Sequence, residues 1–222
     1  MMSDGFETMV DTAQGFFAEL SANNRKDWFE PRKTQYNDDI RKPGELFADL
    51  LAEDISRLTG VSHTPKLFRI YRDVRFSKDK SPYKPWLHML WRPADADDLA
   101  PIWFFSCAPG ELLLGMGVVS LKGAALTRYR VWVDTWGDLA AEAMAEVTAA
   151  TGAGLSTFGA PPLQRVPKPY PPDHPHAELL KRKGLAMMAP LPDTWRDRGL
   201  VGATNDRAKA MMPLWHAFHD HL

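Results

Sequence analysis

Four short segments in the middle of the chain alternate between apolar and polar residues, and turn-forming stretches separate them. The segments cover residues 67–76, 86–92, 102–107 and 111–119. Alternation with a period of two predicts β-strands that each have one face on a core. Because most of the connections are too short for the crossovers of parallel strands, the segments predict an antiparallel sheet of four or more strands.

Segments with helical periodicity lie on both sides of this strand region. In chain order they cover 5–22, a stretch from about 26, 45–58, 123–150, 177–183 and a stretch from about 205. Helices, then a meander of strands, then helices again indicate the α+β class, with N-terminal and C-terminal helices flanking the sheet.

The length of the chain suits one domain, so we expect a single domain over residues 1–222. Within it we expect a helical part at about 5–60 and the strand meander at about 66–120. A helix and a proline-rich C-terminal part follow at about 123–222.

Composition favours a packed interior. Hydrophobic residues make up 45% of the chain and aromatic residues 11%, and the single cysteine, Cys107, excludes an internal disulfide. Cys107 lies in an apolar segment, which predicts a core position. The start of the chain lacks the pattern of a secretory signal, and the longest apolar run, 112–121, is shorter than the ~20 residues that cross a bilayer. We expect a cytoplasmic protein without a membrane partner.

Positive charge is concentrated in residues 66–84. This segment contains seven lysines and arginines but only two acidic residues, Asp73 and Asp79, so its net charge is +5, whereas the whole chain has a net charge of −1. A nucleic-acid-binding domain usually spreads basic charge over a face or a stripe. A concentrated charge on a mildly acidic protein instead predicts a local site for an anion.

The basic side chains of this segment suit a phosphate or a carboxylate ligand, because arginine binds such groups through paired N–H donors and lysine acts as a point charge. We predict ligand binding by Arg69, Arg72, Arg75, Lys78 and Lys84. Other side chains could serve acid–base chemistry, and these are Asp73, Lys80, Tyr83 and His174. Phosphoester or nucleotide chemistry fits this set best, but the residues identify neither a reaction nor a cofactor and leave open whether the protein is an enzyme.

Seven positions of the basic segment form the pattern RxxRDxRFxxxKxxY, namely Arg69, Arg72, Asp73, Arg75, Phe76, Lys80 and Tyr83. This pattern resembles the central motif of a bacterial family, present also in some fungi, that is known as domain of unknown function 2461. The segments SANNRKDWFEPRKTQY (21–36) and RVPKPYPPDHPHAELLKRKGL (165–185) are also similar to segments of that family. The resemblance covers essentially the whole chain. It implies one domain and the same central residues, but no reaction.

Two other functions stay open at this point. A nucleic-acid-binding module would use the basic segment to hold the backbone and aromatic side chains to stack bases, and its basic residues would line an exposed groove. A structural protein would use the same segment for internal ion pairs. Arg72 favours some pairing of this kind, because it falls among apolar positions, where a guanidinium needs a carboxylate or carbonyl partner.

A second polar cluster, Asp173, His174 and His176, has donors that could bind a metal. No further ligand pair at a familiar spacing accompanies it, so we predict no metal site. The cluster is better explained as the start of a helix, with Pro175 at its first turn. An alternative is that His174 folds back toward the basic segment as a general acid or base.

Overall fold

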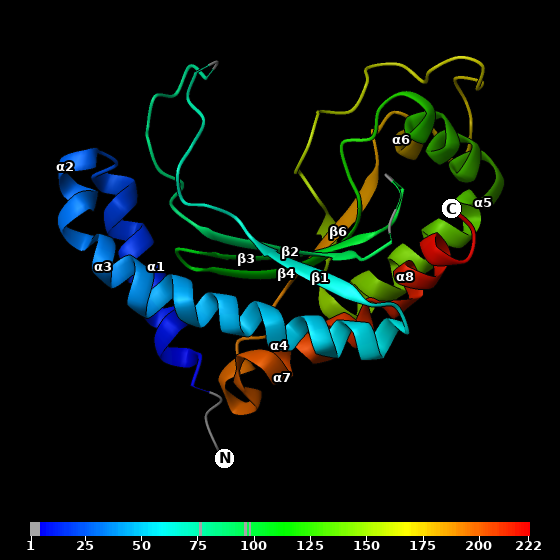
Figure 1. Cartoon of the computed structure of the whole chain (residues 1–222). Helices are drawn as coiled ribbons and strands as arrows, with labels where there is room; N and C mark the ends of the chain where they lie inside the picture. Colours follow the sequence, from blue (N-terminus) through cyan, green and yellow to red (C-terminus); the bar gives the residue numbers. More distant parts are fainter. Residues whose placement is uncertain (1–4, 76, 96, 98) are drawn as a thin grey trace.

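A six-stranded antiparallel sheet lies at the centre of the protein (Figure 1). The structure, a computed structural model, describes residues 5–75, 77–95, 97 and 99–222. The strand order is β1-β2-β3-β4-β6-β5, and each pair of neighbours is antiparallel. Helices from the N-terminal and C-terminal parts of the chain flank the sheet, which confirms the predicted α+β class.

The strands are β1 (His63–Leu67), β2 (Leu87–Pro93), β3 (Ile102–Ala108), β4 (Glu111–Val118), β5 (Gly154–Leu155) and β6 (Leu185–Pro190). Three of the four predicted segments coincide with β2, β3 and β4. The two-residue turn Pro109-Gly110 joins β3 to β4, and Gly110 has the positive φ of 70° that such a turn needs. The first predicted strand is different and is described with the candidate site.

The N-terminal helical part contains α1 (Glu7–Ala22), α2 (Lys26–Phe29), the 3-10 helix η1 (Glu30–Arg32), α3 (Lys33–Gln35), the π-helix η2 (Tyr36–Arg41) and α4 (Lys42–Thr59). The C-terminal part contains α5 (Gly123–Thr151), α6 (Ala177–Leu180), α7 (Trp195–Ala210) and α8 (Met212–His219). The helix predicted from about residue 205 is therefore two helices, and the first of them begins ten residues earlier than expected.

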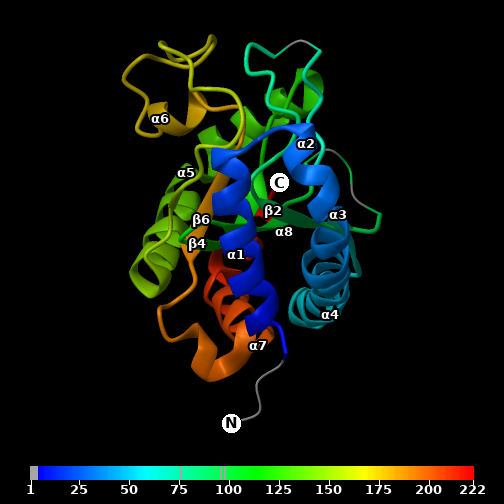
Figure 2. The same ribbon diagram turned by 90° about the vertical axis from the view of Figure 1, so that its left-hand side faces the viewer.

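The two faces of the sheet have different environments, because alternate residues of a strand point in opposite directions. Trp91, Trp103 and Phe105 lie on one face and are fully buried beneath α1, α4, α7 and α8. Figure 2, turned by 90°, shows α1, α4 and α7 gathered on this side. The opposite face, which includes His88 and Phe104, is only half-buried. The main core therefore lies on one side of the sheet and leaves the other side partly open.

The open face has a wall on each side (Figure 1). The segment between β1 and β2 rises on one side, and the proline-rich stretch 156–176 rises with α5 and α6 on the other. The helix α5 bends at Trp136, where φ is −119°, and the ring of His176 occupies the space beside the following residue, Gly137. No helix in the described ranges is both long enough and apolar enough to span a membrane.

Candidate functional site

The predicted strand 67–76 is wrong in its extent. The chain leaves the sheet where β1 ends and returns at β2, and the described residues between them, 68–75 and 77–86, form an irregular projection that we call the basic excursion (Figure 1). Within its described residues, an isolated bridge between Tyr71 and Tyr83 links the two arms. An alternating pattern predicts an extended chain with two faces, but it does not identify the partner strand. Here the partner is the returning arm of the same excursion.

Tyr83 anchors the base of the basic excursion to the N-terminal helices. Its ring is only 2% exposed and stacks on Phe29 of α2 at a centroid distance of 4.2 Å. The side chain of Asn24 donates to Tyr83 O at 2.9 Å and accepts from Tyr83 N at 3.1 Å. Burial raises the pKa of the Tyr83 hydroxyl, so it stays protonated at neutral pH. This residue has the position of a structural anchor.

Two of the predicted ligand-binding arginines pair with acids of the basic excursion itself. Arg75 donates to both carboxylate oxygens of Asp73 at 2.9 and 2.7 Å, and Arg72 forms an ion pair with Asp79. Hydrogen bonds from Ser81 and then Arg72 hold the pKa of Asp79 well below its usual value, and Arg75 lowers that of Asp73. A carboxylate held in this way is a weak base, so the geometry disfavours the general-base role considered for Asp73.

The remaining lysines of the basic excursion have different surroundings. Lys78 is exposed, and Lys80 donates to the carbonyl of Val74 at 3.0 Å. Lys84 lies at the base, with its ammonium group 5.6 Å from the centre of the Phe68 ring. Burial lowers the pKa of Lys84, and the charges of Arg69 and Arg72 lower it further. The electrostatic potential around Lys84 is therefore positive. Phe76, the remaining motif position, lies outside the described residues.

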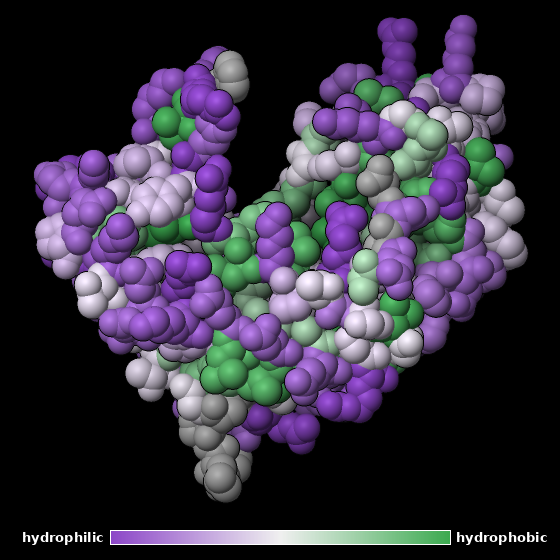
Figure 3. Space-filling view, in the orientation of Figure 1, coloured by the Kyte–Doolittle hydropathy of each residue, from purple (hydrophilic) through white to green (hydrophobic). Residues whose placement is uncertain are grey.

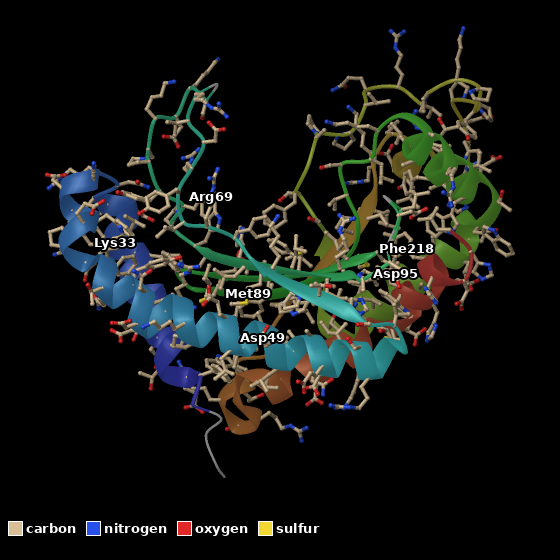
Figure 4. All side chains as sticks on the ribbon, in the orientation of Figure 1. Lys33, Asp49, Arg69, Met89, Asp95 and Phe218 are labelled. Atoms are coloured by element: carbon tan, nitrogen blue, oxygen red, sulfur yellow. The ribbon has the colours of Figure 1, made fainter. Side chains whose placement is uncertain are left out.

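Arg69 differs from the other arginines of the motif because, among the described residues, it has neither an ion pair nor a hydrogen-bond partner. It lines a hollow of about 310 Å³ between the basic excursion and the N-terminal helices. We call this space the Arg69 hollow, and its lining consists of Phe29, Lys33, Tyr36, Asn37, Arg41, Leu67, Arg69, Ile70 and Tyr71. Figure 4 labels Lys33 and Arg69 on the two elements that enclose it. The sequence analysis missed Lys33 and Arg41, although Lys33 falls in one of the segments that resemble the family.

The π-helix η2 supplies three polar side chains of the Arg69 hollow, from Tyr36, Asn37 and Arg41. A π-helical turn is rare and often marks a functional position, because its extra residue displaces side chains from the helical pattern. Burial raises the pKa of Tyr36 to about 12, although the nearby Arg41 acts in the opposite direction. Tyr36 therefore keeps its hydroxyl proton at neutral pH and can donate it to an acceptor.

The described acids neutralise only part of the positive charge of the Arg69 hollow, because Glu45 pairs with Arg41 and the charge of Arg69 acts on Asp73 without an ion pair between them. Arg41 pairs with Glu45 at 3.0 Å, while Lys33 has neither an ion pair nor a hydrogen-bond partner for its side chain among the described residues and is exposed to solvent. Three cations, an amide and two tyrosine hydroxyls thus surround a space without a lining carboxylate. Such a set can donate several hydrogen bonds to one anion and can supply positive charge at the same time.

The segment that precedes α6 lies across the open face from the basic excursion (Figure 1), and this segment contains His174. Its Nδ1 accepts from the backbone N–H of His176, and its Nε2 lies 3.0 Å from Asp134 of α5. His176 lies 3.0 Å from Asp138, one helical turn further along α5. The two histidines therefore attach the proline-rich segment to α5, and the fold does not bring His174 to the Arg69 hollow.

A sequence profile described as "Conserved hypothetical protein (DUF2461)" matches residues 12–216. This range includes α2, η2 and the basic excursion, so the match covers both sides of the Arg69 hollow. No curated protein matched the chain.

Proposed function

The chain belongs to the family of conserved hypothetical proteins designated domain of unknown function 2461, and we propose that it binds a small anion, a phosphate or a carboxylate, in the Arg69 hollow. Arg69 and Lys33 are the primary ligand contacts, and Arg41, which pairs with Glu45, is a secondary one. Tyr36 and Tyr71 donate hydroxyl hydrogen bonds. The proposal concerns binding and assigns no reaction.

The observation that carries the proposal is the absence of a carboxylate partner for Arg69 among the described residues, in a segment where neighbouring arginines have one. Arg72 and Arg75 are paired with Asp79 and Asp73, so they contribute little net charge. Arg69 instead faces a hollow that other cations line. An anion in this hollow would neutralise charge that the described protein groups leave uncompensated.

Thermal-shift and calorimetric titrations at low ionic strength test this proposal. The ligands are inorganic phosphate, succinate and citrate, and the proteins are the wild type, Arg69→Gln, Lys33→Gln and Arg75→Gln. A ligand that binds the folded state raises the melting temperature by mass action. Loss of one charge-assisted contact is expected to weaken binding by about tenfold or more in Arg69→Gln and Lys33→Gln.

Arg75→Gln is the matched control, because it removes the same charge from the basic excursion but does not line the Arg69 hollow. Its affinity should stay close to that of the wild type. An equal loss of affinity in Arg69→Gln and Arg75→Gln would show a response to the general charge of the segment, and this outcome contradicts a defined pocket. A flat response to all three anions also overturns the proposal.

A short single-stranded oligonucleotide belongs in the same experiment, since a nucleic-acid-binding module is the alternative in a different class. Its affinity would fall steeply with salt and would fall in both Arg69→Gln and Arg75→Gln, because phosphate contacts along a strand are distributed. Binding of the oligonucleotide with this pattern, and no binding of the small anions, would favour the alternative.

A further inference from the structure

A separate groove on the open face of the sheet has properties of a ligand site. One part of it is a hollow of about 330 Å³ whose lining is mostly apolar and aromatic, including Phe68, Phe104 and Phe158, but also contains His88 and Arg92. A second hollow of about 290 Å³ adjoins it, and the two share lining residues, namely Val119, Ser156, Phe158 and Ala186. Figure 3 shows the molecule hollowed here between its two walls, with hydrophobic residues on the floor. We call the two hollows together the sheet-face groove.

Arg182 lies at one end of the sheet-face groove and has no partner among the described side chains. Its Nε atom is buried and lacks a hydrogen-bond acceptor, and no described carboxylate forms an ion pair with the guanidinium. Lys183 lines the same hollow, together with the hydroxyl groups of Ser120 and Thr157. Because the guanidinium lines this hollow without a carboxylate partner among the described residues, an anion in the hollow would neutralise its charge.

The backbone around Arg182 is held in an uncommon conformation. Gly184 has a φ of 140°, and a side chain there would collide with the carbonyl of Val118. This close approach lets Leu121 N donate to Lys183 O at 2.8 Å, so the turn before β6 is pressed against the end of β4. Ser120 in the same contact has a φ of 58°, a left-handed conformation that non-glycine residues adopt mainly under constraint and often at functional sites.

The other end of the sheet-face groove is suited to a flat ring. Phe158 is 48% exposed, which is high for a large aromatic side chain, and its ring lies 5.0 Å from that of Phe104. The ring of His88 lies 4.9 Å from that of Phe104 and 5.8 Å from that of Phe158, so the three rings contact one another. Ser156 lines both hollows; its Oγ accepts from Phe158 N at 3.1 Å and keeps its own proton free to donate. Aromatic faces beside such polar groups can stack a heterocycle and bind its edge.

We propose that the sheet-face groove binds a nucleoside phosphate, with the base against Phe158 and Phe104 and the phosphate at Arg182. The mostly apolar hollow suits the ring of the base, and the guanidinium of Arg182, which has no carboxylate partner among the described residues, suits the phosphate. The hydroxyl proton of Ser156 and the ring nitrogens of His88 have no hydrogen-bond partner among the described residues, and a base can bind them whereas an acyl chain cannot. None of these residues lines the Arg69 hollow, so this site is independent of the function proposed above.

Isothermal titration calorimetry with the four common nucleoside 5′-monophosphates tests the proposal, with adenosine and ribose 5-phosphate as partial ligands. Arg182→Gln is expected to weaken binding by at least about tenfold, because it removes a charge-assisted contact. Phe158→Ala is expected to weaken it by about tenfold, the usual scale of a lost base–aromatic stack. Because Phe158 is half exposed, this variant should fold even if Arg182→Gln does not.

Two controls define the position of the ligand. Arg165→Gln removes an exposed positive charge from the proline-rich segment and should bind within about twofold of the wild type. The titrations are repeated in an Arg69→Gln background, so that phosphate binding in the Arg69 hollow does not contribute. The proposal is overturned if none of the four nucleotides binds at millimolar concentration, or if ribose 5-phosphate binds as tightly as the best nucleotide. It is also overturned if binding survives Phe158→Ala unchanged, or if Arg69→Gln abolishes it.

Discussion

Asn24 holds both backbone polar groups of Tyr83, with its amide nitrogen 2.9 Å from Tyr83 O and its amide oxygen 3.1 Å from Tyr83 N. The two residues are 59 positions apart, and this pair of hydrogen bonds joins the end of α1 to the returning arm of the basic excursion. The contact sets the position of the base of the excursion, from which Arg69 and Lys84 extend.

Replacing Asn24 with alanine should destabilise the protein by about 1–3 kcal/mol, because it leaves two partly buried backbone groups without partners. The free energy of unfolding from urea titration measures this change. The neighbouring Asn23→Ala is the control, since Asn23 bonds only to an exposed carbonyl in its own helix, and a change within about 0.5 kcal/mol is expected. Equal effects of the two substitutions would contradict the role assigned to Asn24.

Gly137→Ala should destabilise the protein by about 1–3 kcal/mol, although the same change inside a helix is usually stabilising. A methyl group at Gly137 would overlap the ring of His176, which lies against α5. Thermal unfolding of the variant measures the effect. Gly15→Ala in α1 has the opposite expected sign, a gain of about 0.5–1 kcal/mol, because no atom lies near the added methyl group.

A double variant tests whether the clash with His176 causes the destabilisation by Gly137→Ala. In a His176→Ala background the ring is absent, so adding Gly137→Ala should be neutral or stabilising. Persistent destabilisation in that background would exclude the clash with His176 as the cause.

His88 should make the protein less stable as the pH falls below about 6.5. Burial lowers the pKa of His88 to about 3, and the charge of Lys84 acts in the same direction. Between the ordinary histidine pKa of about 6.5 and the lowered pKa of about 3, the unfolded chain takes up a proton that the folded protein does not. Lowering the pH in this range therefore reduces the free energy of unfolding by at most about 1.4 kcal/mol per pH unit. Above about pH 7 the histidine is neutral in both states and contributes no pH dependence.

The comparison with His88→Phe isolates this contribution from the carboxylates. The phenylalanine keeps a ring against Trp86 and Phe104 but cannot titrate. The difference in unfolding free energy, wild type minus variant, should be constant above about pH 7 and should decrease between about pH 6 and pH 4. A difference that does not vary with pH would refute the proton linkage.

Cys107 should resist thiol reagents in the folded protein. It lies in β3 with no exposed surface, and burial raises its pKa to about 12, so almost no thiolate forms at neutral pH. Because the chain has one cysteine, the labelling kinetics with an aromatic disulfide reagent are simple to interpret. Labelling should follow the rate of unfolding and should be rapid in urea. Fast labelling without denaturant would show an opening that the structure does not contain.

Much of the fold was predictable from periodicity. The strands β2, β3 and β4 coincide with the predicted alternating segments, and α1 and α4 lie close to the predicted apolar stripes. The extent of the first strand was not predictable in the same way, because the alternation of Phe68 and Ile70 with Arg69 and Tyr71 continues into the basic excursion. Alternation reports two faces of an extended chain, whereas membership of a sheet depends on a neighbour that is remote in sequence.

The candidate site was predictable only in part. The excess of positive charge pointed to the basic excursion, but it did not distinguish Arg69, which has no carboxylate partner among the described residues, from Arg75, which Asp73 neutralises. Lys33 and Arg41 were not identified, because no pattern near them differs from an ordinary solvent-exposed helix. They join Arg69 only because η2 packs beside the basic excursion.

The amino-acid sequence by itself determined which stretches become helices and strands and where the positive charge is concentrated. Both properties depend on neighbouring residues, whose spacing and charge are visible along the chain. The tertiary structure alone decided which cations are neutralised and which surfaces stay open, including the Arg69 hollow and the unpartnered Arg182. Electrostatic pairing and cavity formation depend on distances between residues that are remote in sequence, and only packing sets those distances.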